Sequence, residues 1–223
     1  MSPRSSRDLR KGCAEVLKLF VIVATLAFAW PLGAQTAATQ TSAAVTASPL
    51  AGAQLLAALR AGGYVIYFRH ASTDFSANDE AMTTFEDCAK QRNLTEQGKN
   101  EARAIGDDVR ALKVPIGDVL ASPFCRTLET AKLIFGRATS SMDVRGGPAD
   151  ADEARYAGLR KLLSTPLPPG KNLVIVSHGN PFRAVAGGTY LAEGEAAIVA
   201  PRGKDGFVIV ARVRKDEWAA LAK

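Results

Sequence analysis

The sequence predicts an α/β fold in which a mostly parallel central sheet lies between two layers of helices, a three-layer α/β/α sandwich. Short and almost wholly apolar runs occur at Tyr64–Arg69, Ile116–Ala121 and Leu173–Val176, as expected for strands that are buried on both faces. Segments with helical spacing of apolar residues lie between these runs, which is the order that a parallel sheet requires. The composition agrees, because 47% of the 223 residues are hydrophobic and 22% are charged, as in globular proteins.

The first element is expected to be a helix over Ala51–Arg60, because its three leucines share one side and a glycine pair follows its end. The strand at Tyr64–Arg69 comes next. Residues 70–93 then form a long polar loop, and long loops in compact domains are usually functional. Thr95 is placed to cap a helix that runs to about Leu112.

The second half of the body continues the alternation of strands and helices. After the strand at Ile116–Ala121, Ser122-Pro123 opens a helix that continues through Phe135 and ends at Gly136. The elements expected after it are a weak strand at Met142–Val144, a helix over Ala151–Leu163, the strand at Leu173–Val176, a helix over Asn180–Val185, edge strands at Ala197–Ala200 and Gly206–Val213, and a helical turn at Asp216–Leu221.

Residues 1–34 have the pattern of a secretory signal peptide. A basic, polar stretch precedes the apolar run Leu19–Trp30, which is shorter than the about 20 residues that a membrane span needs. We expect cleavage after Ala34 and a periplasmic or secreted protein, with 35–49 as a flexible linker of small polar residues and 50–223 as the folded domain. The alternative is an uncleaved leader, which would be the chain's only contact with a membrane.

The cysteines agree with export. Cys13 lies in the leader, so cleavage leaves Cys88 and Cys125. A remaining pair in an oxidising compartment favours a disulfide between them. Two buried free thiols are the alternative, because sequence spacing alone does not determine whether the two side chains meet.

The charge of the chain is distributed unevenly. The leader carries five basic and two acidic residues, whereas the rest of the chain carries 23 basic and 20 acidic residues. A body with so small an excess of positive charge and no basic stripe is not expected to bind nucleic acid.

Unusual polar residues follow the three strongest strands. Arg69-His70 ends the first strand, Ser122 to Arg126 follows the second, and Ser177-His178-Gly179-Asn180 follows the third. Ligands of open α/β sheets bind at the carboxyl ends of the strands, so these residues are expected to converge there. Guanidinium groups and helix N-termini both favour phosphate oxygens, which predicts a phosphate pocket that contains both histidines of the chain. Two histidines are too few for a closed metal site, and no metal or other cofactor is expected. Two buried structural histidines are the remaining alternative.

Four motifs resemble those of the histidine phosphatase superfamily, which includes phosphoglycerate mutases, phosphohistidine phosphatases and acid phosphatases. They occur in the family's order over roughly residues 60–190. The motifs are Arg69-His70-Ala71, with alanine where the family has glycine; Leu94-Thr95-Glu96-Gln97-Gly98; Ser122-Pro-x-x-Arg126; and Ser177-His178-Gly179-Asn180.

The resemblance implies a role for each of the shared residues. His70 is expected to be the nucleophile that forms a phosphohistidine, and Arg69, Arg126 and His178 are expected to hold the phosphoryl oxygens. Together with the leader, this predicts an exported, metal-independent phosphomonoesterase that acts on a small phosphorylated substrate. The alternatives are a phosphate- or phosphosugar-binding protein without catalytic activity and a phosphomutase.

A leaving alkoxide also needs a proton donor, usually a carboxylic acid. Glu153 is the candidate, because mutase-like members of the family place a glutamate near this position. Asp152, Asp74, Asp79 and Glu80 are its rivals. Thr73 and Asn180 are candidates for contacts with the substrate, although each is equally suited to capping a loop or a helix.

Overall fold

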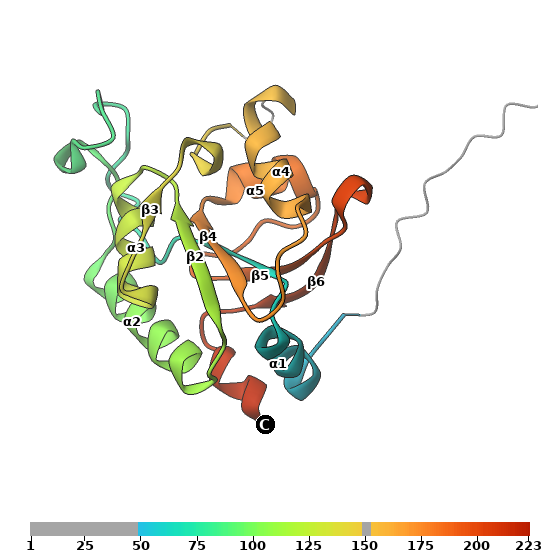
Figure 1. Cartoon of the computed structure of the whole chain (residues 1–223). Helices are drawn as coiled ribbons and strands as arrows, with labels where there is room; N and C mark the ends of the chain where they lie inside the picture. Colours follow the sequence, from blue (N-terminus) through green and yellow to red (C-terminus); the bar gives the residue numbers. More distant parts are fainter. Residues whose placement is uncertain (1–48, 149–152) are drawn as a thin grey trace, which may run out of the picture. The chain divides into compact units, whose positions relative to one another are not determined.

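A six-stranded sheet organises the computed structural model, which describes residues 49–148 and 153–223 (Figure 1). The strand order is β3-β2-β4-β1-β5-β6. Strands β1 to β4 run parallel to one another, and β5 is antiparallel to both β1 and β6. The predicted α/β fold with a mostly parallel sheet is therefore confirmed. The strands are β1 (Val65–Arg69), β2 (Ile116–Ala121), β3 (Thr139–Ser140), β4 (Asn172–Ser177), β5 (Ala196–Pro201) and β6 (Phe207–Val213).

Helices cover both faces of the sheet (Figure 1). The α-helices are α1 (Gly52–Ala61), α2 (Glu96–Ala111), α3 (Cys125–Phe135), α4 (Ala157–Ser164) and α5 (Gly179–Ala186). Short 3-10 helices occupy Cys88–Lys90, Met142–Val144, Glu153–Tyr156, Gly203–Asp205 and Trp218–Ala222.

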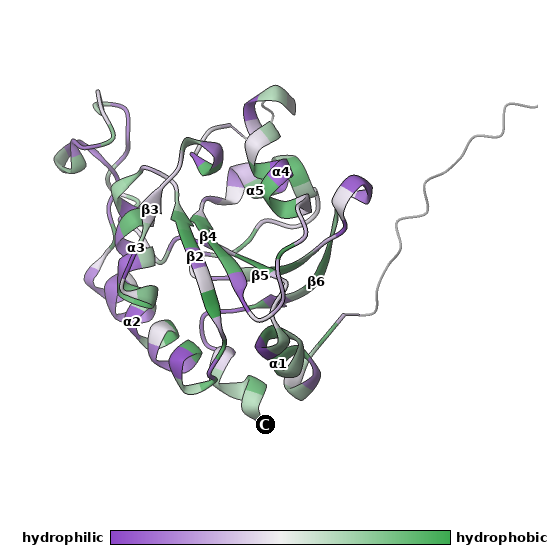
Figure 2. Cartoon of the chain, in the orientation of Figure 1, coloured by the Kyte–Doolittle hydropathy of each residue, from purple (hydrophilic) through white to green (hydrophobic). Residues whose placement is uncertain are grey.

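Two apolar cores lie on opposite faces of the sheet, because side chains alternate along each strand. In β1, Ile66 and Phe68 pack into the core that α1, α2 and α3 cover. Val65 and Tyr67 pack into the core that α4 and α5 cover. Figure 2 shows the result, with apolar residues along β2 and β4 and polar residues along the outer side of α2. The three-layer arrangement follows from this alternation.

The ends of α2 and α3 lie where the sequence signals predict them. The Thr95 hydroxyl accepts a hydrogen bond from the Gly98 amide and so caps α2. Gly136 ends α3 in the left-handed conformation, with φ of 74°. Gly98 has a second role, because a Cβ atom there would lie 2.0 Å from the Ser72 carbonyl oxygen. Glycine therefore allows the loop after β1 to pass directly against α2.

The structure corrects three of the expected elements. Met142–Val144 is a 3-10 helix rather than a strand, and the Val144 carbonyl accepts a hydrogen bond from the Ser177 hydroxyl instead of joining a ladder. The helix expected over Ala151–Leu163 starts later, with a 3-10 turn before α4, and residues 149–152 lie outside the description. Ala197–Ala200 is no edge strand, because β5 lies between β1 and β6 and is almost fully buried.

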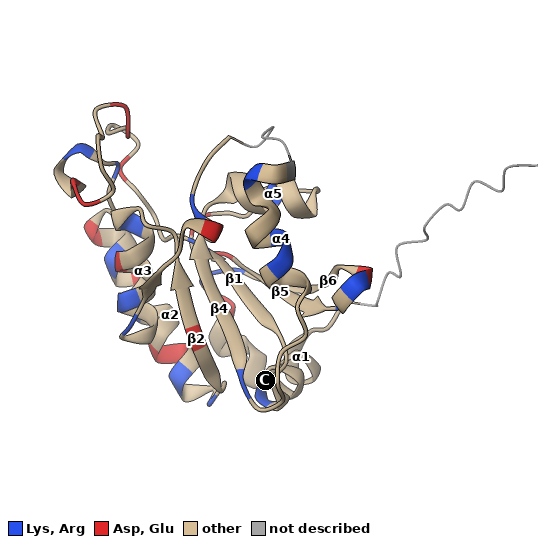
Figure 3. Ribbon diagram, turned by 45° about the horizontal axis from the view of Figure 1, so that its top comes forward, with Lys and Arg blue, Asp and Glu red and all other residues tan. Residues whose placement is uncertain are grey.

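Charged residues of both signs occur along α2 and α3, as Figure 3 shows. Several of them form pairs one turn apart, such as Lys99 with Glu96 and Arg110 with Asp107. Within the described residues, no helix combines the length and the apolar character that crossing a membrane would require. The leader, residues 1–34, and nearly all of the linker at 35–49 lie outside the description, so both remain expectations.

Candidate active site

The carboxyl ends of β1, β2 and β4 meet at one edge of the sheet, and residues at or just after these ends line a pocket of about 370 Å³. Five predicted residues line this pocket: Arg69, His70, Arg126, His178 and Asn180. The convergence arises from the fold, since β4 lies between β1 and β2 and all three strands point the same way. The rings of His70 and His178 lie edge to face, with their centroids 5.5 Å apart.

His70 is held as a neutral imidazole with a defined tautomer. Its Nδ1 lies 2.9 Å from the Ala71 carbonyl oxygen, which can only accept, so Nδ1 carries the hydrogen. Nε2 therefore keeps its lone pair. Burial, reinforced by the positive charges of Arg126, Arg69 and Arg92, lowers the pKa of His70 to about 3. The side chain is thus suited to act as a nucleophile through Nε2 over a wide pH range.

His178 is the N-cap residue of α5 and is also neutral, because burial lowers its pKa well below the ordinary value. Its Nε2 lies 2.8 Å from the Ser122 hydroxyl, and its Nδ1 lies 3.5 Å from Arg126 Nη2. The hydroxyl can donate to Nε2 or accept from it. Arg126 Nη2 can only donate, so its contact with Nδ1 corresponds to the tautomer with the hydrogen on Nε2. When the Ser122 hydroxyl donates to Nε2 instead, Nδ1 carries the hydrogen and can bind a phosphoryl oxygen. Ser122 belongs to the Ser122-Pro-x-x-Arg126 motif, and the structure shows that its hydroxyl is a hydrogen-bond partner of His178.

Arg126 is almost fully buried, and a carboxylate engages its guanidinium fork. Its Nη1 and Nη2 donate to the two carboxylate oxygens of Asp79, at 2.9 and 3.0 Å. Asp79 lies in the long loop after β1 and lines the pocket. Two parallel bonds of this kind are the geometry in which a guanidinium binds two phosphate oxygens. The carboxylate therefore occupies the position that an anionic ligand of Arg126 requires.

Arg69 is anchored by the segment that follows α5. Its Nη1 donates to the Leu191 carbonyl at 2.8 Å, and its Nη2 lies 3.6 Å from Glu193 Oε1. The guanidinium also lies over the Tyr190 ring. Burial is the main reason that the pKa of Arg69 is lowered, as it is for Arg126.

Of the other predicted site residues, one lines the pocket, one is buried outside its lining, and one has a side chain outside the described residues. Asn180 lies in the first turn of α5 at the pocket wall. Thr73 is buried outside the pocket lining, and both its amide and its hydroxyl donate to Glu193. Glu153 begins a 3-10 helix, but its side chain lies outside the described part of the chain, as does Asp152.

Arg92 is a pocket residue that sequence reasoning missed. It lies at the end of the loop after β1, and its guanidinium stacks on the exposed Phe75 ring at 4.8 Å. The only available signal was its position just before the Leu94-Thr95 helix opening. Arg69, Arg92 and Arg126 share a further property. The Nε atom of each is buried and has no hydrogen-bond partner within the described residues.

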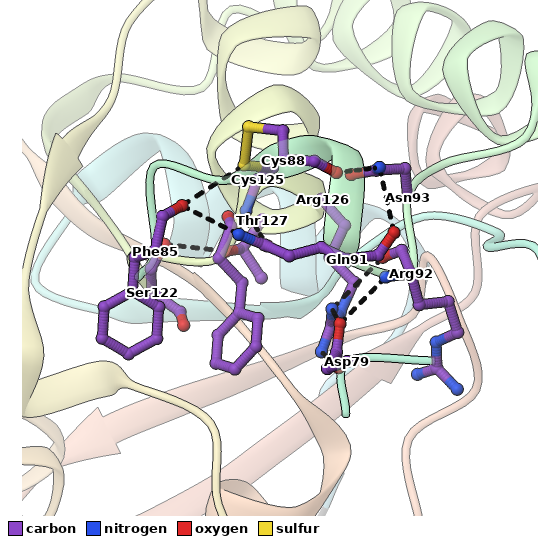
Figure 4. Close-up of a disulfide and its surroundings, with 11 residues drawn as sticks. Asp79, Phe85, Cys88, Gln91, Arg92, Asn93, Ser122, Cys125, Arg126 and Thr127 are labelled. Carbon is purple, nitrogen blue, oxygen red and sulfur yellow. Dashed lines mark hydrogen bonds and ion pairs between the residues drawn. A yellow bond between two sulfur atoms is a disulfide. The ribbon is translucent and has the colours of Figure 1, made fainter. Parts of the chain in front are cut away.

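A disulfide holds the loop after β1 against α3 (Figure 4). It joins Cys88 to Cys125, the first residue of α3, so the predicted bond is present and the free-thiol alternative is not. Gln91 adds a second link, because its side-chain carbonyl accepts from the Cys125 amide at 2.9 Å. The Arg92 carbonyl accepts from Arg126 Nη1 at 3.2 Å. The loop and Arg126 therefore form one connected unit.

Acidic, histidine and cysteine side chains do not gather into a group of three or more suited to a metal ion anywhere in residues 49–148 and 153–223. The expectation that the reaction needs no metal stays a prediction.

A comparison with protein families matches residues 65–161 to the histidine phosphatase superfamily, branch 1. This segment, which is less than half of the 223 residues, is therefore similar to that superfamily. The segment contains Arg69, His70 and Arg126, and it ends before His178. No curated protein matches the chain at a significant level.

Solved structures of three phosphatases are similar to this chain at low sequence identity. The protein histidine phosphatase SixA in complex with tungstate is 18% identical, with a TM-score of 0.46, over 68% of this chain and 97% of that chain. Phosphoserine phosphatase from Entamoeba histolytica, solved with 3-phosphoglyceric acid, is 15% identical, with a TM-score of 0.47, over 67% and 95%. Mycobacterial glucosyl-3-phosphoglycerate phosphatase, solved with inorganic phosphate, is 14% identical, with a TM-score of 0.45, over 62% and 89%.

Proposed function

We propose that the chain is a phosphomonoesterase that transfers the phosphoryl group of a small substrate first to His70 and then to water. One observation carries the proposal. Three arginines line the pocket that contains a neutral histidine: Arg126 is buried, and Arg69 and Arg92 are half-buried. The Nε atom of each is buried and has no hydrogen-bond partner among the described residues. Buried donors without partners are unfavourable, and phosphoryl oxygens supply acceptors of the matching charge.

In the first step, His70 Nε2 forms a bond to phosphorus while the ester P–O bond breaks and the alcohol leaves with a proton. In the second step, water attacks the phosphohistidine and releases phosphate, so the histidine returns to its starting state. Arg69, Arg126 and the Nδ1–H form of His178 hold the three oxygens that carry the charge of the transferring group. Arg92 adds a fourth donor at the loop side of the pocket.

The proton donor of the first step is a separate proposal. Glu153 remains the candidate from the resemblance. Among the rivals whose side chains are described, Asp79 lines the pocket, whereas Asp74 and Glu80 are exposed outside its lining. The donor matters for a poor leaving group and hardly at all for p-nitrophenolate. Its replacement by the amide should therefore slow hydrolysis of an alkyl phosphate much more than that of p-nitrophenyl phosphate.

The direct test is hydrolysis of p-nitrophenyl phosphate by residues 35–223 at pH 4–8 with a chelator present. We expect activity that resists the chelator and disappears in His70→Ala. Quenching in an alkaline denaturant, in which phosphohistidine is stable, should trap phosphate on the wild-type chain but not on the variant. Phosphate binding without turnover would instead favour the binding-protein alternative. Transfer of the phosphoryl group to an added alcohol rather than to water during turnover would favour the phosphomutase alternative.

A further inference from the structure

Besides Asp79, the Glu193 carboxylate lies near the site, close to His70 on the Nδ1 side of the imidazole. Glu193 Oε1 is 3.8 Å from His70 Nδ1 and 3.6 Å from Arg69 Nη2. The Glu193 side chain is 13% exposed and is not part of the pocket lining. It is therefore near the nucleophile without having access to the substrate.

The Glu193 carboxylate is fixed in place by the loop after β1. The Thr73 amide and hydroxyl donate to its two oxygens, at 3.2 and 2.6 Å. The next residue, Gly194, donates its amide to the His70 carbonyl at 2.9 Å. These bonds connect the segment after α5 to the residues on both sides of Ala71. A charge held in this way needs no rearrangement during a reaction.

The charge balance around His70 explains why a carboxylate is needed at this position. Transfer of a phosphoryl group to Nε2 leaves the Nδ1 hydrogen in place, so the ring acquires a positive charge. Burial and the charges of Arg126, Arg69 and Arg92 all oppose a cationic ring. Within the described residues, Glu193 is the carboxylate that lies in ion-pair range of the His70 ring.

We propose that Glu193 is a positioning residue that stabilises the positive charge which His70 acquires on phosphorylation. The proposal rests on the phosphohistidine mechanism above. Glu193 acts through Nδ1 and Arg69 and makes no contact with the substrate. In the first step of the mechanism, His70 Nε2 gains the phosphoryl group and the leaving oxygen gains a proton from the proton donor. The positive charge of the imidazole ring is then compensated by the Glu193 carboxylate at 3.8 Å.

The variant Glu193→Gln tests this role, because the amide oxygen can still accept from Thr73 while the negative charge is lost. We expect kcat/KM for p-nitrophenyl phosphate to fall about 10- to 100-fold, since this ratio reports the steps up to phosphorylation of the enzyme. The Kd for inorganic phosphate should stay the same or become smaller, because a negative charge near an anion site has been removed. Glu193→Asp, which restores the charge, should recover part of kcat/KM.

A matched control is Glu101→Gln. Glu101 accepts a hydrogen bond from Ser72 in the same loop, but its charge is paired with Lys215. This variant should keep the wild-type kcat/KM. An unchanged kcat/KM in Glu193→Gln would overturn the proposal, as would a loss of kcat/KM with equally weakened phosphate binding, which indicates a structural role only. A wild-type chain without turnover would overturn the phosphatase mechanism itself, and this inference with it.

Discussion

In the proposed mechanism, Asp79 and the phosphoryl group of the substrate require the same two nitrogens of Arg126. The carboxylate makes two bonds to the guanidinium, and the Arg92 amide donates to it as well. A ligand must displace this internal competitor before it binds Arg126. We therefore expect Asp79→Asn to tighten the binding of inorganic phosphate about tenfold, measured by calorimetry, which corresponds to about 1.4 kcal/mol.

Glu86→Gln is the matched control for this change, because it removes one exposed carboxylate from the same loop outside the pocket. Its phosphate affinity should equal that of the wild type. Weaker binding in Asp79→Asn would contradict the prediction and would show that Asp79 orients Arg126 for the ligand.

The two histidines should make the folded protein sensitive to acid. Their pKa values are lowered in the folded state, that of His70 to about 3, while both are about 6.5 in the unfolded chain. Below pH 6.5 the unfolded chain therefore binds protons that the folded chain does not. The free energy of unfolding should fall by about 1.4 kcal/mol per pH unit for each histidine as the pH drops below 6.5.

Urea unfolding at pH 7 and pH 5 measures this effect, and His70→Asn separates it from the titration of carboxylates. The variant should lose less stability than the wild type over the same interval. An identical loss in both proteins would show that His70 accepts a proton in the folded state.

The sequence predicted the position of site residues that come directly after a strand. His70, Arg126 and His178 were placed in one pocket because parallel strands end at the same edge. Arg92 was not recognised, and Asp79 was named only as a rival proton donor and not as a partner of Arg126, since both lie in an irregular loop whose path depends on tertiary contacts. Glu193 was missed altogether. It belongs to no motif, and its contacts to Thr73 are long-range in sequence.

At the scale of elements, the loop after β1 depends on α3 for its position. The Cys88–Cys125 disulfide and the hydrogen bond from the Cys125 amide to the Gln91 side chain fix the second half of this loop beside Arg126 (Figure 4). In the chain-entropy model, a disulfide with a separation of 37 residues stabilises by about 4 kcal/mol. The double variant Cys88→Ser/Cys125→Ser should therefore lose about 4 kcal/mol of unfolding free energy and bind phosphate more weakly, because Arg92 is no longer held.

Reductant provides the control for this prediction. It should lower the phosphate affinity of the wild type toward that of the double variant and leave the double variant unchanged. A wild-type chain that keeps its stability and its affinity after complete reduction would show that packing alone positions the loop.

The errors in the predicted elements also have physical causes. The β5 segment resembles an edge strand in sequence because it is short and lies near the C-terminus, yet it pairs with β1 on one side and β6 on the other. Met142–Val144 has the composition of a strand, but β3 at Thr139–Ser140 has already filled the edge beside β2. In both segments the structure depends on which strands lie beside them in the sheet, and a sequence pattern does not contain this information.

For the whole molecule, we propose that the leader is removed during export and that the mature chain begins at Gln35. Expression of all 223 residues in a bacterial host with a periplasm should give a periplasmic protein whose mass corresponds to 35–223, with the disulfide formed. A chain that lacks 1–34 should stay in the cytoplasm with two reduced thiols. Recovery of the soluble protein with residues 1–34 still attached would contradict the cleavage.

The architecture was predictable because the apolar runs and the helical periodicity agree over most of the body. Both apolar cores follow from the alternation of side chains along β1. What sequence could not supply was the pairing of distant segments, such as the contact of Glu193 with Arg69.

The place of β1 in the sheet has a consequence for a chain that is still being synthesised. Its two neighbours are β4 and β5, which pair Val65 with Leu173 on one side and with Val199 on the other. A ribosome must therefore deliver almost the entire polypeptide before the strand that carries Arg69 and His70 has either partner. Such non-local pairing delays folding. We therefore expect β1 to stay unpaired for most of translation, a state that would suit the export proposed above.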